Sequence, residues 1–300
     1  MDQIAALKVF VAVVEEESFS GAARKLNLSR TAVSKQVMDL EAHLKARLLN
    51  RTTRRQSLTG TGGAYFARAK RILSEIEEAD AEATNQSLTP SGLLRVNAPL
   101  SFGTKHIAPN LKTYLDRYPD VVVDLTLNDR VVDLVDEGYD LAVRIGQLAD
   151  SSLIARRLAG GAIYLCAAPS YLAEHGTPQH PAELANHSCL VYSYLAQPDR
   201  WRFTRNGEEF NVRLKPRLIG NNGDALAAAA MAGLGIVLQP AFIVDEAFQD
   251  GRLRQILPDY SAGGFDVHAV YPSTRLVSAR VRTFIDHLLV CLSEQTPREN

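Results

Sequence analysis

The first part of the chain alternates helical apolar patterns with short polar turns. Apolar residues recur at the spacing of one helical face at Ile4, Leu7, Val11 and Val14. This spacing predicts a first amphipathic helix. A second short helix is expected over residues 21–26, with Ser20 as its N-cap, because a serine hydroxyl can accept a free amide at a helix start. A tight turn over residues 27–29 follows.

The third predicted helix has two chemically different faces. Ser29 is expected to cap it, and its inward positions are Val33, Val37 and Leu40. The opposite face carries polar and basic side chains: Arg30, Thr31, Ser34 and Lys35. A helix that follows a tight turn and exposes such groups fits the major groove of DNA. There Arg30 would bond a guanine. Thr31 and Ser34 would reach base edges or phosphates, and Lys35 would meet a phosphate.

A basic hairpin is expected after a further helix over residues 41–48. Its basic residues are Arg51, Arg54 and Arg55, and residues 56–60 close the hairpin pattern. Such a hairpin would lie along the DNA backbone as a wing. Each element alone is also typical of an ordinary solvated surface. Five elements in this order predict a winged helix-turn-helix DNA-binding domain over residues 1–62.

Charge is unevenly distributed along the chain. Residues 1–71 carry 13 Lys/Arg against six Asp/Glu, a net charge of +7, whereas residues 72–300 carry 20 against 28, a net charge of −8. The alternative explanation is a chance fluctuation in the placement of solvated surface charges. Together with the motif, however, a basic module on an acidic body indicates that only the first part meets a polyanion.

A heptad pattern follows the hairpin. The residues at its a and d positions are Tyr65, Ala69, Ile72, Ile76, Ala79 and Ala83. This pattern predicts a linker helix and hinge over residues 63–91, with a seam that pairs two chains. A helix packed on its own domain would show the same spacing. The glycines at 62–63 and the polar run over 85–92 favour a free-standing rod instead. A dimer also suits DNA binding, since two copies read two half-sites.

From residue 93 onward, strand and helix patterns alternate. Strands are expected over residues 93–96, 121–127 and 141–145, and helices over 104–117 and 130–136. This βαβαβ order predicts a parallel sheet with right-handed crossovers.

A second α/β unit begins near residue 161. Its expected elements are strands over residues 161–166, 189–192, 201–203, 212–218 and 236–238 and a helix over 225–232. A late strand over 267–271 and a closing helix over 277–292 can return to the first unit. The chain from 92 to 300 is therefore expected to form a two-lobed α/β effector-binding domain, similar in architecture to periplasmic binding proteins. The lobes would comprise residues 92–162 plus 267–300, and residues 163–266.

Ligands of open α/β sheets bind at the carboxyl ends of strands, near helix N-termini. The residues in such positions are Ser101, Phe102, Asn128, Arg144, Asn222 and Asp224. Their hydroxyl, amide and guanidinium groups favour a small anionic effector, with Phe102 over an apolar part. Ser101, Asn128 and Asp224 can also be explained as helix caps, and Arg144 as an ion-pair partner. Two aromatic residues are expected in the core: Trp201 and Phe203.

Composition and spacing exclude several other classes. Of the 300 residues, 46% are hydrophobic and 22% charged, unlike a disordered chain. The apolar stretch over 225–238 is shorter than the roughly 20 residues that span a bilayer, and the N-terminus lacks a signal-peptide pattern, so a cytoplasmic location is expected.

Three scattered cysteines and unpaired histidines predict no metal, and no cofactor motif is complete. The sequence around Ser101 lacks the first glycine of a nucleophile elbow, so no enzyme is expected.

The N-terminal motifs resemble those of LysR-type transcriptional regulators. They are SFSGAARKLNLSRTAVSKQV at 18–37, LE at 40–41, LLNR at 48–51 and LTGTG at 58–62. Two positions depart from the family pattern. Leu49 stands where members often have Phe, and Arg30-Thr31 where many have Gln-Pro. The second departure lies at the base-reading end of the helix and therefore bears on the operator sequence.

The resemblance extends to the effector domain with less specific motifs. It implies linker helices that pair antiparallel, and a cleft lined by the loops at 101 and 222. The implied partners are a double-stranded DNA operator, a small effector, further copies in a dimer or tetramer, and RNA polymerase if the protein activates. One alternative is a ligand-independent repressor or architectural DNA-binding protein, which would not need a two-lobed sensor. Another is a hydrolase fused to a DNA-binding module.

Overall fold

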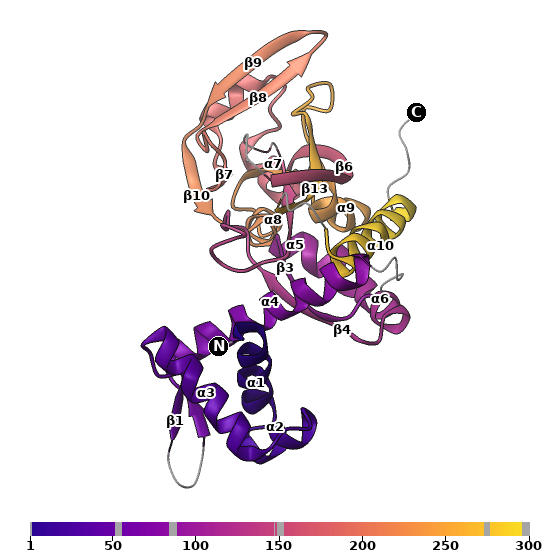
Figure 1. Cartoon of the computed structure of the whole chain (residues 1–300). Coiled ribbons are helices and arrows are strands. Elements are labelled where there is room, and N and C mark those ends of the chain that lie inside the picture. Colours follow the sequence, from indigo (N-terminus) through magenta and orange to yellow (C-terminus); the bar gives the residue numbers. More distant parts are fainter. Residues whose placement is uncertain are drawn as a thin grey trace. The chain divides into compact units, whose positions relative to one another are not determined.

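The computed structural model describes residues 2–51, 56–83, 89–146, 148, 153–272 and 277–295. The chain divides into two compact units, Met1–Thr89 and Pro90–Asn300, and each is described by itself (Figure 1). Within the described residues, every helix is too short or too polar to cross a membrane.

The first unit is a helical domain with a two-stranded hairpin. Its elements are α1 (Gln3–Glu15), α2 (Phe19–Lys25), α3 (Arg30–Leu44), β1 (Leu49–Arg51), β2 (Gln56–Leu58) and α4 (Gly60–Ala83). α1 is buried on a wider face than predicted, because α2, α3 and α4 all pack against it. Leu7 and Val11 are buried, but so are Val9 and Phe10, whereas Ile4 is 45% exposed.

Short polar side chains fix the turn between α2 and α3. Ser29 caps α3 as predicted, since its Oγ accepts the N–H of Ala32 at 3.1 Å. The prediction of Ser20 as the cap of α2 is wrong, because the helix begins earlier and Ser18 Oγ accepts the Gly21 N–H. Asn27 adopts a left-handed φ of 53°, and asparagine tolerates this conformation at the end of a helix.

The helix predicted over residues 41–48 is not separate. α3 continues through Leu44 and ends where Lys45 takes a left-handed φ of 51°. Glu41 then ties the helix to the hairpin, since its Oε1 accepts the N–H groups of Leu48 and Leu49. The three inward positions of α3 are all fully buried: Val33, Val37 and Leu40.

α4 corrects the free-standing rod expected after the hairpin. The glycines at 62–63 lie inside this helix, and a Cβ on Gly62 would stand 2.0 Å from Leu48 O, so the helix passes too close to the backbone for any other residue. Ala69 and Leu73 are buried against the helical domain. Tyr65 also packs on Phe10, with ring centroids 5.9 Å apart. The first half of α4 therefore belongs to its own domain, as the alternative interpretation held.

The second unit is an α/β fold. Its strands are β3 (Gly92–Ala98), β4 (Val121–Leu127), β5 (Leu141–Ile145), β6 (Leu153–Ala167), β7 (Cys189–Tyr192), β8 (Arg200–Arg205), β9 (Glu208–Arg213), β10 (Pro216–Gly220), β11 (Ile236–Pro240), β12 (Arg254–Gln255) and β13 (Gly264–Pro272). Its helical segments are α5 (Leu100–Phe102), η1 (Gly103–Ile107), η2 (Ala108–Asn110), α6 (Leu111–Arg117), α7 (Pro169–His175), η3 (Pro181–Asn186), α8 (Gly223–Met231), α9 (Ala241–Gln249) and α10 (Ala279–Gln295).

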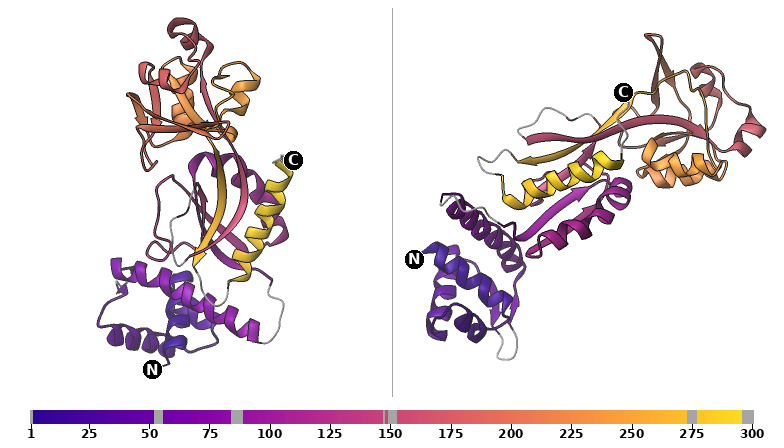
Figure 2. Two further views of the ribbon diagram at one scale, coloured as in Figure 1. Left: turned by 90° about the horizontal axis from the view of Figure 1, so that it is seen from above. Right: turned by 90° about the vertical axis from the view of Figure 1, so that its right-hand side faces the viewer.

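Two half-sheets share the long strand β6. The order is β10-β7-β11-β6-β13-β5-β3-β4, with β8 and β9 as a separate hairpin. Figure 2 shows β6 and β13 as long curved strands that run between the two halves. We call the half with β3, β4, β5, α5 to α6 and α10 the first lobe, and the half with β7 to β11 and α7 to α9 the second lobe. β3 pairs in parallel with both β4 and β5, as the βαβαβ pattern predicts.

Each lobe has its own core. In the first lobe, the returning helix α10 buries Phe284 and Leu288 against Val96 and Leu141. In the second lobe, Trp201 and Phe203 are buried as predicted, at 2% and 0% exposure. The late strand and the closing helix thus complete the first lobe.

Three predicted elements differ from the structure. The helix over 104–117 starts earlier and passes through a π-turn and a 3₁₀ turn, η1 and η2. Residues 130–136 are not helical, because Asp133 Oδ1 accepts the N–H groups of Val135 and Asp136 and closes a turn instead. The strand over 212–218 is divided between β9 and β10. Two helices, α7 and α9, were not predicted.

Candidate DNA interface and effector cleft

The polar face of α3 is open to solvent. Arg30, Thr31 and Lys35 are exposed and Ser34 is half-buried. Ser29 and Thr31 share a hydrogen bond of 2.9 Å between their hydroxyls at the start of the helix. The structure thus presents all four predicted base- and phosphate-facing residues on one turn-and-a-half of helix. The wing residues Arg54 and Arg55 lie outside the described residues, and Arg51 ends strand β1.

An ionic cluster links the linker helix to the helix-turn-helix. Glu15, at the end of α1, accepts from Lys70 of α4 at 2.7 Å and from Lys25 of α2 at 3.1 Å. Burial alone would raise the pKa of Glu15, but the bonds from Lys70 and Lys25 outweigh it and hold the pKa below 4.5. The carboxylate of Glu15 therefore joins three helices of the first unit.

In the first lobe, Arg144 stands on β5 beside Asn97 of β3. Arg144 Nη1 donates to Asn97 Oδ1 at 2.7 Å and to the carbonyl of Val143. Arg144 makes no ion pair with any residue that the structure describes, which disfavours the ion-pair interpretation. Burial lowers its pKa. Its Nη2 atom is buried with no hydrogen-bond partner among the described residues.

Ser101 and Phe102 lie at the end of β3, in α5. Both are buried, at 5% and 3% exposure. Ser101 does not cap this helix: the N-cap position is Pro99, and Asp129 Oδ1 accepts the Leu100 N–H at 2.8 Å instead. Phe102 belongs to the first-lobe core, where it packs edge-on against Phe242 of the second lobe.

Asn128 follows β4 at the same sheet edge. Its backbone N–H bonds to Ala98 O at 3.0 Å. Its side-chain Oδ1 is buried and makes no hydrogen bond to a described residue. Asn128 therefore offers an acceptor at this edge and does not cap a helix.

In the second lobe, Asn222 caps α8. Its Oδ1 accepts the Ala225 N–H at 2.9 Å, while its Nδ2 is buried without a partner in the described chain. Gln239 of β11 is 2% exposed, and its Nε2 is likewise unpaired. The side chain of Gln239 lies beside Gly223, because a Cβ there would stand 2.9 Å from Gln239 Oε1. Two amide donors without a partner in the described part of the chain thus lie beside the N-terminus of α8.

The carboxyl ends of the strands in the two lobes face each other. Lys105 of η1 donates to the carbonyl of Phe242 at 3.1 Å and lies 3.6 Å from Asp224 Oδ1 of α8. Tyr192, at the end of β7, interacts with Asp129 of the first lobe. The pKa of Tyr192 is raised, mainly by burial and also by the negative charge of Asp129. These bridges bring the loops after β3, β4, β7 and β10 together at one junction.

Four residues of this junction are not among the candidates that the sequence offers: Asn97, Lys105, Tyr192 and Gln239. A signal existed for Gln239, because it is a polar residue directly after a predicted apolar strand. Lys105 lay in a predicted helix, and nothing in the sequence indicated that it reaches the other lobe.

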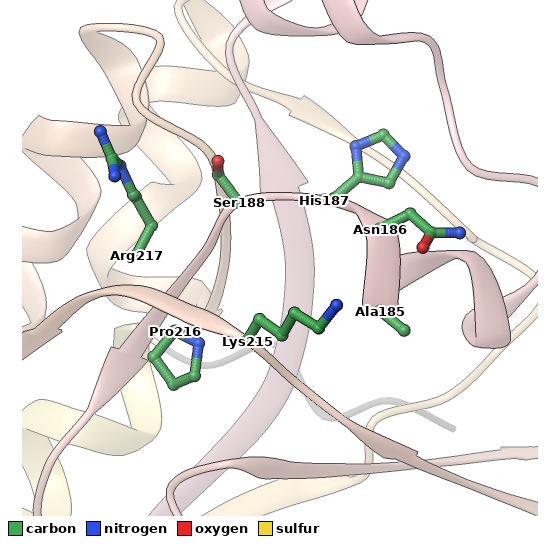
Figure 3. A pocket seen from close by; sticks show the side chains of 7 residues that line it. All are labelled: Ala185, Asn186, His187, Ser188, Lys215, Pro216 and Arg217. Atoms are coloured by element: carbon green, nitrogen blue, oxygen red, sulfur yellow. The ribbon is translucent and has the colours of Figure 1, made fainter.

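Two surface hollows lie elsewhere. One, of about 400 Å³, is lined by residues 185–188 and 215–217 at the amino ends of β7 and β10 (Figure 3). The other, of about 210 Å³, is lined by Met38, Glu41, Arg47 and Leu49 of the first unit. Among the described residues, no three His, Cys, Asp or Glu side chains gather in an arrangement that could hold a metal ion.

The fold and these sites define a class: a DNA-binding regulator with a two-lobed ligand-binding domain. Residues 4–63 match the family model "Bacterial regulatory helix-turn-helix protein, lysR family", and residues 88–290 match "LysR substrate binding domain". The chain belongs to the LysR family of transcriptional regulators. It binds DNA through the helix-turn-helix and a small-molecule effector through the second unit.

Known proteins similar to this chain include regulators from several bacteria. An HTH-type transcriptional regulator of Haemophilus influenzae is 38% identical, covering 94% of this chain and 98% of that protein. The solved structure of CrgA, a LysR-type regulator of Neisseria meningitidis, is 36% identical with a TM-score of 0.61, covering 96% of this chain and 98% of the other. The Vibrio cholerae virulence activator AphB is 29% identical, with a TM-score of 0.61 and coverage of 97% and 100%.

Proposed function

We propose that this regulator responds to a small anionic effector held where the two lobes meet. One observation carries the proposal: Arg144 Nη2, Asn222 Nδ2 and Gln239 Nε2 are buried N–H donors without partners among the described residues. Leaving such a donor unpaired costs about 1–3 kcal/mol, more for a charged one. An oxyanion can accept hydrogen bonds from such donors, and the N-terminus of the nine-residue helix α8 favours negative charge.

Ser101 and Asn128 complete the proposed site from the first lobe. The Ser101 hydroxyl makes no hydrogen bond with a described residue, so it is available to an effector. Asn128 Oδ1 would accept from a hydroxyl or amine on the same ligand. Phe102 follows Ser101 in α5, and its ring packs on Phe242 of the second lobe. Asp224 would act through its ion pair with Lys105.

The DNA-binding half of the proposal rests on the exposed face of α3. Arg30, Thr31 and Ser34 would contact base edges, and Lys35 would contact a phosphate. The wing residues Arg51, Arg54 and Arg55 would follow the backbone. We assign DNA binding to residues 1–62, the linker and hinge to 63–91, and effector binding to 92–300.

We further infer that the protein works as a homodimer or a dimer of dimers on an interrupted inverted repeat. Ile72 on α4 is 42% exposed, so an apolar side chain of the heptad seam remains open to a second copy. Effector binding would change lobe closure and, through the packing of subunits, the bend of the DNA. Such a regulator acts on the chromosome in the cytoplasm and, if it activates, contacts RNA polymerase.

A ligand screen tests the effector proposal. Full-length protein is heated with small carboxylates, phosphates and matched neutral amides or esters, and the unfolding temperature is recorded. Only anions are expected to raise it, because binding to the folded state alone stabilises that state. The variant Asn222→Ser retains a capping oxygen but loses the amide donor, so it is expected to lose the shift. A neutral compound that stabilises wild type and Asn222→Ser equally would contradict the proposal.

A further inference from the structure

Lys105 occupies an unusual turn at the junction of the lobes. It lies in the π-turn η1, which directly follows the short helix α5 at the end of β3. π-turns widen a helix and often occur at functional sites. Gly103 permits this path, because a Cβ there would stand 2.2 Å from Leu127 Cδ2 of β4. The segment therefore lies close on the first-lobe sheet while Lys105 extends to the second lobe.

Among the described residues, the hydrogen bonds and the ion pair of the Lys105 ammonium group are with the second lobe. Its Nζ donates to the carbonyls of Phe242 and Ile243 in the first turn of α9, at 3.1 and 3.5 Å. It also lies 3.6 Å from Asp224 Oδ1 in the first turn of α8. The side chains of Lys105 and Asp224 are 32% and 44% exposed, so the pair is only partly screened by water. Burial raises the pKa of Asp245 of α9, and the positive charge of Lys105 acts on it in the opposite direction.

Asp224 creates an electrostatic problem for the proposed effector site. It stands two residues after Asn222, at the same helix N-terminus where the unpaired Asn222 and Gln239 donors lie. A carboxylate in this place repels an anionic ligand, and in a partly buried site this repulsion is strong. A cation within about 4–6 Å of the carboxylate stabilises its charge and offsets its repulsion of the ligand.

We propose that Lys105 is the specificity-determining residue that lets this site take an anion: it neutralises Asp224 across the lobe junction. Lys105 need not touch the effector. Hydrogen bonds to the carbonyls of Phe242 and Ile243 hold the Lys105 ammonium group on α9. Lys105 therefore neutralises Asp224 only while the two lobes are in contact. Lys105 thereby couples the charge of the effector to lobe closure. This inference rests on the proposed anionic effector.

A double-mutant cycle on the full chain tests the charge role. Succinate and inorganic phosphate serve as probes, and binding is measured by calorimetry at low ionic strength. Lys105→Met is expected to weaken binding of the better probe at least about tenfold, because Asp224 is then uncompensated. Asp224→Asn is expected to bind more tightly than wild type, because the carboxylate that repels the anion is gone. The double variant is expected to recover to within about threefold of wild type.

The control is Lys112→Met, which removes another first-lobe lysine that pairs on the surface with Asp116. It is expected to bind as wild type does. A double variant as weak as Lys105→Met would overturn the inference, since Lys105 would then act by direct contact or by structure alone. Equal weakening by Lys112→Met would overturn it too, because net charge would explain the effect. If wild type binds neither probe, the anionic-effector proposal itself fails.

Discussion

Arg144 holds Asn97 with one nitrogen of its guanidinium group, and its other terminal nitrogen is buried without a hydrogen-bond partner among the described residues. The bond from Nη1 to Asn97 Oδ1 is 2.7 Å, and Nη2 makes no hydrogen bond to a described residue. The first bond fixes the direction of the second arm, so Arg144 is both a structural and a proposed binding residue.

Arg144→Met separates these two roles. It leaves Asn97 Oδ1 with no donor, which is expected to cost about 1–3 kcal/mol of unfolding free energy. Anion binding is expected to weaken at least about tenfold, since a buried positive charge is lost. Arg144→Lys retains the charge and is expected to lose less affinity. Denaturant unfolding and calorimetry measure the two effects. Arg202→Met, on the exposed hairpin of the second lobe, is the matched control and should change neither.

Base reading and phosphate contact are separable on α3. Arg30→Ala is expected to relax base preference at one operator position, at a cost of about 1–3 kcal/mol for the preferred base. Lys35→Ala is expected to weaken binding to all sequences and to reduce the salt slope by about one unit. Binding selections on randomised operators at several salt concentrations measure both. An unchanged base preference for Arg30→Ala would remove Arg30 from the base-reading set.

Two neighbouring residues of α4 are expected to behave in opposite ways. Leu73 is 8% exposed and packs on the helical domain, so Leu73→Ala is expected to lower the stability of that domain by about 2–5 kcal/mol. Ile72 is 42% exposed, so Ile72→Asp should leave the domain folded but abolish dimerisation through the seam. Sedimentation and thermal unfolding distinguish the two. A normally dimeric Ile72→Asp protein would place the seam elsewhere.

The Glu15 cluster predicts a pH dependence of stability in the first unit. Because the folded state holds the pKa of Glu15 below 4.5, its stabilising effect is present above about pH 4.5 and is lost as the pH falls through the depressed pKa. Lys70→Met should therefore be less stable than wild type near neutral pH, and the difference should shrink in acid. In a Glu15→Gln background, Lys70→Met should have little further effect. A difference that stays constant from pH 7 to pH 3 would contradict this assignment.

The sequence predicts what local patterns determine. Val33, Val37 and Leu40 specify the inward face of α3, and the capping hydroxyl of Ser29 specifies its start. The strands β3, β4 and β5 follow from short apolar runs between polar loops. These features depend on neighbours along the chain, which the sequence displays directly.

Other features depend on contacts that the sequence does not display. Residues 130–136 have helical apolar spacing, but the Asp133 side chain closes a turn there instead. The glycines at 62–63 favour a free-standing rod, yet Gly62 is needed inside α4, where the helix passes the backbone of Leu48. Ser101 and Asn222 could be proposed from the sequence because they follow strands. Lys105 could not, because its proposed role depends on contacts with residues 242 and 224 of the other lobe.

The most direct test of the account is operator binding by the full chain with and without an anionic effector from the ligand screen. Fluorescence anisotropy on a promoter fragment compares wild type with Ser101→Ala. Wild type is expected to change operator affinity or binding mode on adding the effector. Ser101→Ala is expected to bind the operator normally without effector and to need a higher concentration for the same change, because the two sites lie in separate units. An identical effector response in Ser101→Ala would contradict the placement of the effector site.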